Sequence, residues 1–275
     1  MHDLLAYCES FKRWPTSVDY AARLAALFDC RLTGIHVCPS PSMVLSPYET
    51  PQLTTELLEA TRQLEEEAFG AAASFEAFAR GRSATRASWL VAEEEVPRAL
   101  ALAGNWHDAL VVGRTRHTPW GAVSAVGSLV LGSGMPCIVV PESQTDGVSL
   151  DVIAIAWNGS SEAIRATHAA LPLLRRARKV TILHGRQRPA ASMAAWKPAF
   201  DLAEYLAGHG IPSESTLLSE SDDATGNLLL GSARQANANL LVMGAYGHTR
   251  FSEWVLGGAT RAVLEGLDIP VLMRH

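Results

Sequence analysis

The stretch that decides the fold is LLVMGAYGHTRFSEWVLGGATRAVL, residues 240–264. It begins with a short apolar run, which is typical of a strand buried on both faces. A glycine-rich turn follows, and Gly258 opens a segment with helical periodicity. A buried strand followed by glycines and a helix is the local pattern of a parallel α/β sheet.

The same pattern occurs twice in the chain. At an offset of 131 residues, the apolar run 240–244 falls on 109–113, and at an offset of 148 the segment 151–184 falls on 3–36. The first copy therefore has 17 extra residues, which we assign to the proline-rich segment 39–55 as a surface insertion. Two copies of one unit explain the length of 275 residues.

In each copy, short apolar runs alternate with helical segments, which predicts a parallel sheet with crossover helices. The fold class is α/β, with two tandem five-stranded domains at 1–145 and 149–275. The predicted strands are 4–7, 31–37, 85–91, 109–113, 137–141, 152–157, 179–184, 213–218, 240–244 and 269–274. The predicted helices are 16–28, 56–79, 96–103, 198–208, 225–236 and 258–265, with a further helix after residue 160.

Composition excludes several classes of function. The net charge of −5 disfavours binding to nucleic acid. Four cysteines without CxxC spacing predict reduced thiols in a cytoplasmic protein. Residues 117–141 lack Asp, Glu, Lys and Arg, but four glycines and three prolines predict a turn, a short helix and a strand there, and no membrane span.

The glycine-rich turn of the second copy offers a site for an anion. Ligands of parallel α/β sheets bind at the carboxyl ends of the strands, and helix N-termini favour anions. Gly244 and Gly247 would let the backbone approach a ribose and phosphates. The free N–H groups of Gly258, Ala259 and Thr260 would face the phosphates. The alternative is a turn whose glycines only allow strand and helix to pack closely.

This turn resembles a known signature. The turn has two glycines three residues apart, then a nine-residue spacer, then a further Gly pair. This spacing is similar to the nucleotide-binding signature of universal stress proteins (UspA-like). The segments AWNGS (156–160) and IPVLM (269–273) add to the resemblance. It covers both copies, so the chain is similar to the tandem type, which implies Rossmann-like (adenine nucleotide alpha hydrolase-like) domains.

The resemblance implies an adenine-nucleotide site in the second domain, for ATP or AMP, with no metal beyond Mg accompanying the nucleotide. Asn158 stands where nucleotide-binding members usually have Asp, and His184 lies near the adenine. Gly244 lies by the ribose. The implied site residues are Trp157, Asn158, Gly159, Ser160, His184, Met243, Gly244, Gly247, His248, Gly257, Gly258, Ala259 and Thr260.

Two residues of the second copy depart from the signature. Asn158 replaces the acid, although its amide still offers a donor and an acceptor. Gly258 replaces a hydroxyl residue, which removes a hydrogen bond worth about 1 kcal/mol.

The first copy departs further. Its first strand ends in Glu9-Ser10 where the second copy has Asn-Gly-Ser, and Arg116 replaces the second glycine of the turn. We expect this copy to be structural, with an empty site. The retained pair Gly127-Ser128 leaves the alternative open.

No catalytic motif is present, because GxxxxGK[ST], GxSxG and HExxH are all absent. His36 and His184 are equivalent in the repeat, and we expect them to cap strand ends and not to bind zinc. A stress-response regulatory or binding protein, not an enzyme, is therefore predicted. The alternatives are a non-nucleotide scaffold acting through protein contacts and, third, a slow ATPase.

The resemblance also implies how the two copies associate. Units of this family pair through their last strands, so 137–141 and 269–274 would join the two domains in an intramolecular pseudo-dimer. The sequence leaves open whether two chains form a homodimer. The expected partner is an adenine nucleotide, with no nucleic acid and no membrane.

Overall fold

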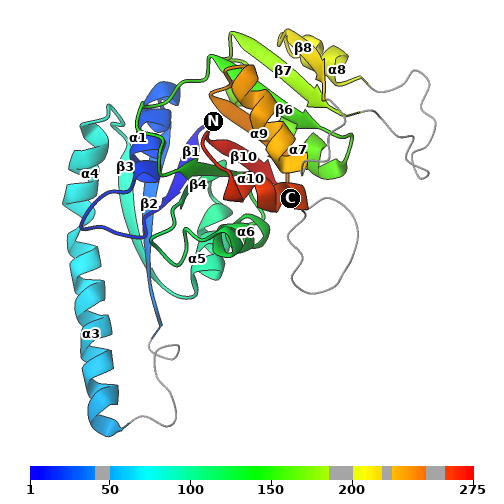
Figure 1. Cartoon of the computed structure of the whole chain (residues 1–275). Helices are drawn as coiled ribbons and strands as arrows, with labels where there is room; N and C mark the ends of the chain where they lie inside the picture. The colour runs from blue at the N-terminus through cyan, green and yellow to red at the C-terminus, as the bar shows by residue number, and fades with distance from the viewer. Residues whose placement is uncertain (41–49, 186–200, 219–224, 246–257) are drawn as a thin grey trace. The chain divides into compact units, whose positions relative to one another are not determined.

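The computed structural model describes residues 1–40, 50–185, 201–218, 225–245 and 258–275. These residues divide into two compact units, Met1–Val148 and Ser149–His275. In each unit, parallel strands form a sheet with helices on both faces (Figure 1). The predicted α/β class is confirmed.

In the first unit the strand order is β3-β2-β1-β4-β5, and every pairing between neighbours is parallel. Helices α1, α3 and α4 lie on one face, and α5 and α6 pack together on the other. The strands are β1 (Asp3–Tyr7), β2 (Arg31–Cys38), β3 (Ala87–Glu93), β4 (Ala109–Arg114) and β5 (Cys137–Pro141). The helices are α1 (Thr16–Phe28), α3 (Pro51–Gly70), α4 (Ala72–Arg80), α5 (Val96–Gly104) and α6 (Val123–Gly132).

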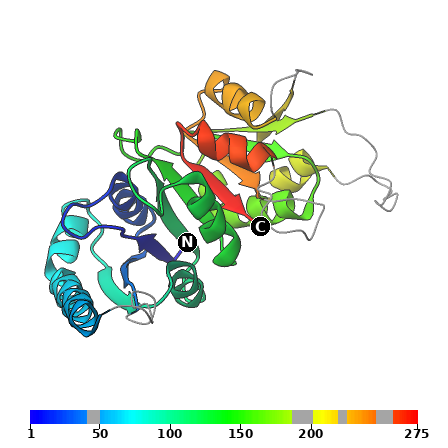
Figure 2. The same cartoon turned by 60° about the horizontal axis from the view of Figure 1, so that its bottom comes forward.

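In the second unit the order is β10-β9-β6-β7-β8, again parallel throughout. Figure 2 shows α9 and α10, in orange and red, side by side on one face of this sheet. The strands are β6 (Val152–Trp157), β7 (Lys179–His184), β8 (Ser213–Leu217), β9 (Leu240–Gly244) and β10 (Val271–Arg274). The helices are α7 (Ser161–Leu174), α8 (Leu202–Gly208), α9 (Thr225–Gln235) and α10 (Gly258–Glu265).

The insertion and the helix after it differ from the prediction. Helix α3 begins at Pro51, inside the segment 39–55, because Thr50 caps it and accepts a hydrogen bond from the N–H of Leu53. The single helix predicted at 56–79 is broken at Ala71. The indole N–H of Trp89 donates to the Ala68 carbonyl at 2.8 Å, just before this break.

The first strand is shifted by one residue from the offset of 148. Leu4 pairs with Ala109 in β4. Leu240 is the residue of the second unit that is equivalent to Ala109, and it pairs with Ile153, so Leu4 is equivalent to Ile153. The pairings with β2 and β7 show the same shift. Sequence identity alone placed Leu4 on Val152, which the sheet register corrects.

The charge-free segment 117–141 contains the ten-residue helix α6 and the strand β5, as predicted. In the part of the chain that the structure describes, no helix is both long and apolar enough to cross a bilayer. Cys8, Cys30, Cys38 and Cys137 are all buried, and none of these four described residues forms a disulfide.

Candidate functional site

The candidate site lies at the carboxyl edge of the second unit's sheet, where the strand order reverses. From β6 the chain goes to β7 on one side and later returns to β9 on the other. The ends of β6 and β9 are neighbours, because Ala156 pairs with Met243. Such a reversal is where ligands of open α/β sheets bind.

The turn after β6 is built by its own side chains. The side-chain oxygen of Asn158 accepts from the N–H of Ser160 at 3.0 Å, and Gly159 has φ of +73°. Ser160 is the N-cap of α7, and its hydroxyl accepts from the N–H of Ala163 at 3.2 Å. Asn158 is exposed and Trp157 is half-buried. The side-chain oxygen of Asn158 therefore shapes the turn.

Gly244 has a packing role. A Cβ at this position would lie 2.6 Å from the nitrogen of Ala163 and 2.7 Å from the carbonyl carbon of Glu162. The first turn of α7 therefore rests directly on the end of β9. At Gly113, the equivalent residue of the first unit, a Cβ would lie 3.0 Å from the Ser17 hydroxyl in α1. The sequence left open whether the glycines of this turn serve close packing of strand and helix. At Gly244 close packing does require a glycine.

His184 ends β7 beside Trp157 and is half-buried, with its Nδ1 3.2 Å from the carbonyl of Gly185. Its carbonyl accepts from the N–H of Leu218 at 2.8 Å. Met243 is buried under the edge. The structure therefore brings Trp157, Asn158, Gly159, Ser160, His184, Met243 and Gly244 to one edge of one sheet.

Helix α10 begins at Gly258, which is exposed, and no atom of the described residues lies within 4 Å of a Cβ placed there. Ala259 is half-buried and Thr260 is buried. A crossover helix between parallel strands runs opposite to them, so this first turn faces the carboxyl edge. Gly247, His248 and Gly257 lie outside the described residues.

Sequence reasoning missed Glu162. This acid is in the first turn of α7, only 7% exposed, and accepts from the hydroxyl of Ser161 at 3.0 Å. A carboxylate in a helix's first turn is stabilised by the helix dipole. The sequence does show an acid directly after Ser160-Ser161, at a predicted helix start. It does not show that this acid is buried, because its burial depends on Gly244, which is distant in the sequence.

The equivalent edge of the first unit is built differently. Because β1 is shifted by one residue, Glu9 stands at the position of Asn158. Gly127, whose pair with Ser128 left open the alternative of an occupied first site, lies in the second turn of α6 and is buried. Its N–H is used inside the helix, so it does not face an anion. Arg116 is exposed.

The histidines show no ligand cluster. His36 is buried, and its Nδ1 lies 2.7 Å from the carbonyl of Cys8. Among the residues with described positions, no three His, Cys, Asp or Glu side chains gather as a metal site would require.

The two units are thus doubly wound parallel α/β domains of one architecture. A model described as the universal stress protein family matches residues 150–275. The second unit is therefore a universal stress protein domain.

Solved structures extend the likeness of fold to both units. A universal stress protein from Archaeoglobus fulgidus DSM 4304 is 15% identical, with a TM-score of 0.69, over 99% of this chain and 95% of that chain. A functionally unknown protein from Pseudomonas aeruginosa PAO1 is 13% identical, with a TM-score of 0.58, over 100% and 92% of the two chains. No curated relative matches the sequence.

Proposed function

We propose that the second unit binds ATP or a related adenine nucleotide, and that the chain acts as a stress-response binding protein. The observation that carries the proposal is the open start of α10 at Gly258, facing the edge where β6 and β9 end. The nucleotide's phosphates would lie against this helix start. Asn158 and His184 would lie beside the nucleoside. Mg²⁺ would arrive with the nucleotide.

The match of residues 150–275 to the universal stress protein family supports this reading, because it covers the unit that holds the proposed site. The exposed side chain of Asn158 supports it as well, since its amide group carries N–H donors in addition to the oxygen that accepts from Ser160.

Isothermal titration of the full chain with ATP, ADP and AMP tests the proposal. Gly258→Asp is the informative variant, because the position is open and a carboxylate would repel phosphate without a clash. We expect at least about tenfold weaker ATP binding, since charged contacts of this kind are worth roughly 1.5–3 kcal/mol.

Gly70→Asp is the matched control, because Gly70 is equally open and lies in the first unit. It should leave nucleotide binding unchanged. A chain that shows no heat and no thermal shift with millimolar nucleotide would contradict the proposal, and so would equal ATP affinity in the two variants.

A scaffold that acts through protein contacts is the second candidate. It is favoured by Gly244, whose lack of a side chain is already explained by packing against α7. Under this proposal the full chain would bind none of the three nucleotides.

Catalysis is not part of the proposal. We expect the chain to hold nucleotide without turning it over, and steady release of phosphate from ATP by the purified chain would contradict this. Glu9→Gln and Gly258→Asp variants would then show which unit is responsible.

We further propose that the units associate as an intramolecular pseudo-dimer through β5 and β10. The apolar sequences of these strands, CIVVP and VLMR, support the proposal.

A further inference from the structure

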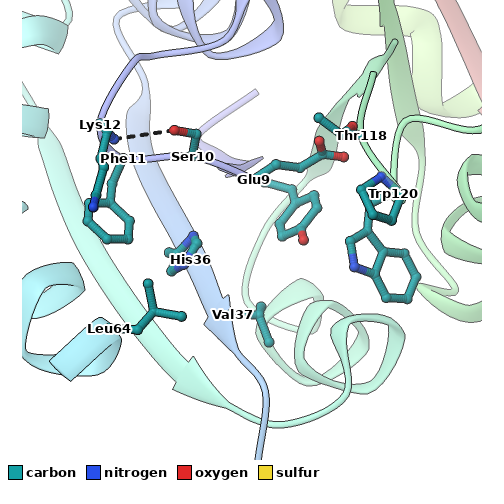
Figure 3. Close-up of a pocket in the computed structure, with 11 residues that line it drawn as sticks. Glu9, Ser10, Phe11, Lys12, His36, Val37, Leu64, Thr118 and Trp120 are labelled. Carbon is teal, nitrogen blue, oxygen red and sulfur yellow. Dashed lines mark hydrogen bonds between the residues drawn. The ribbon is translucent and has the colours of Figure 1, made fainter. Parts of the chain in front are cut away.

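The carboxyl edge of the first unit holds a cavity of about 370 Å³ (Figure 3). Residues from the ends of β1 and β2, from α3 and from the loop after β4 line it. Most of the lining is apolar or aromatic, and it includes Tyr7, Phe11, Leu64 and Trp120. This volume is at the lower end of what small-molecule sites occupy, enough for one ring and a short chain.

Several residues at the cavity differ from their equivalents in the second unit or come from the inserted segment's helix. Leu64 comes from α3, the helix that begins in the inserted segment. Glu9 replaces Asn158, and Phe11 follows two residues later. The first unit has therefore diverged from the second at the positions that surround this cavity.

Glu9 is the charged group inside the cavity. Figure 3 shows its carboxylate beside Thr118, and a hydrogen bond from the Thr118 side chain acts to lower the pKa of Glu9. Burial nevertheless raises the pKa of Glu9 above its ordinary value, because one hydroxyl does not replace the lost water. A carboxylate has room for several donors, so a ligand donor can still approach it.

Positive charge at the cavity is confined to its rim. The Nζ of Lys12 lies 3.0 Å from Glu67, and the Lys12 side chain is 74% exposed. Burial lowers the pKa of His36 even though a hydrogen bond to the Cys8 carbonyl opposes this, so the ring is neutral at pH 7. Phe11 packs edge-on against that ring, with centroids 4.8 Å apart.

An anionic ligand has no support here. The pair Gly127-Ser128 is inside α6, which begins at Val123, so no glycine begins this helix as Gly258 begins α10 in the second unit. A phosphate would also meet the carboxylate of Glu9 in an apolar surrounding, which is unfavourable.

We propose that this cavity binds a small organic cation, an amine or quaternary ammonium group on an apolar body. The charge would pair with Glu9, and the body would lie against Trp120, Phe11 and Tyr7, where cation–π attraction and apolar burial add to the pairing. This ligand class is opposite in charge to the nucleotide of the second unit, so each proposal stands or falls without the other.

The test is isothermal titration of the full chain with three probes of one shape: benzylamine, benzyl alcohol and benzoate. We expect benzylamine to bind at least about tenfold more tightly than benzyl alcohol, because a hydrogen-bonded charge pair is lost with the alcohol. Benzoate should not bind.

Two variants locate the binding. Glu9→Gln keeps a polar partner for Thr118 and should weaken benzylamine binding about tenfold while leaving benzyl alcohol unchanged. Trp120→Leu should weaken benzylamine binding about fivefold. Glu59→Gln, an exposed acid on α3 outside the cavity lining, is the matched control and should bind like the unmodified chain. Far-UV circular dichroism and thermal melting establish that each variant is folded.

A second readout does not depend on the variants. The carboxyl carbon of Glu9, followed by NMR, should titrate at lower pH when benzylamine is present, since a bound cation favours the ionised form. Benzylamine binding no tighter than that of benzyl alcohol would overturn the proposal. Equal losses in Glu9→Gln and Glu59→Gln, or an unmoved Glu9 titration, would do the same.

Discussion

Gly244 lies where the end of β9 meets the first turn of α7. A methyl group there would approach the Ala163 nitrogen to 2.6 Å. It would also meet the carbonyl carbon and the Cβ of Glu162, so none of these contacts is with the far end of a flexible side chain. We expect Gly244→Ala to lower the free energy of unfolding by about 1–3 kcal/mol, the cost of overpacking. Urea denaturation of the full chain measures this.

Gly258→Ala is the control for that substitution, because a Cβ at Gly258 meets open space. It should change the free energy of unfolding by less than about 0.5 kcal/mol. Similar losses in the two variants would show that close packing is not what requires glycine at Gly244.

Asp19 in α1 pairs with Arg23 at 2.6 Å and with Arg82 at 2.7 Å. Burial acts to raise its pKa, but the hydrogen bonds and charges of the two arginines outweigh burial and hold the pKa below its ordinary value. A lowered folded-state pKa contributes stability above the unfolded-state pKa, and that stability is lost as pH falls through the folded-state value.

We therefore expect Asp19→Asn to cost about 1 kcal/mol of unfolding free energy at pH 7, as for a favourable surface network. The difference from the unmodified chain should shrink as pH falls from about 5 towards 3. Urea denaturation at a series of pH values measures it, with the exposed Asp146→Asn as control. A difference that stays constant with pH would rule out this electrostatic origin.

At the scale of elements, the start of α7 depends on one hydroxyl. Ser160 accepts from the N–H of Ala163, so Ser160→Ala should cost about 1 kcal/mol, whereas Ser160→Asp keeps an acceptor and adds a favourable charge. Thermal melting of the three proteins checks the order. If the Asp variant is no more stable than the Ala variant, the cap is not what stabilises this helix start.

The break between α3 and α4 shows why helix bounds were predicted only in part. Residues 56–79 have helical periodicity throughout, and local propensity does not require a break at Ala71. The Trp89 indole, donating to Ala68, and Phe75, whose ring would meet a Cβ at Gly34 at 2.5 Å, set the direction of α4 over the sheet. Both contacts join residues far apart in the sequence.

At the scale of the whole molecule, the proposed pairing of β5 with β10 predicts a pattern of hydrogen exchange. Within its own unit, β5 is hydrogen-bonded to β4, and β10 is hydrogen-bonded to β9. If the strands pair, the backbone N–H groups that point away from β4 and β9 should exchange as slowly as the others. We expect this in the full chain by NMR. Rapid exchange of the outward set alone would contradict the pseudo-dimer.

The sequence by itself determined the duplication, the α/β class and the position of nearly every strand. Strands that are buried on both faces of a parallel sheet consist of short apolar runs, which can be recognised in a single sequence. Its resemblance to the universal stress protein signature implied one candidate site for Asn158, His184 and Gly244, and these residues lie at one edge of the sheet because carboxyl ends of parallel strands share that edge.

Only the tertiary structure decided the register of β1, the reason for Gly244 and the cavity of the first unit. Pairing of Leu4 with β4 corrects the repeat by one residue, which local identity does not report. The cavity joins Glu9, Leu64 and Trp120, whose separation along the chain leaves no periodic pattern to detect. Close packing between distant segments is settled by three-dimensional contact, and single-sequence periodicity carries no record of it.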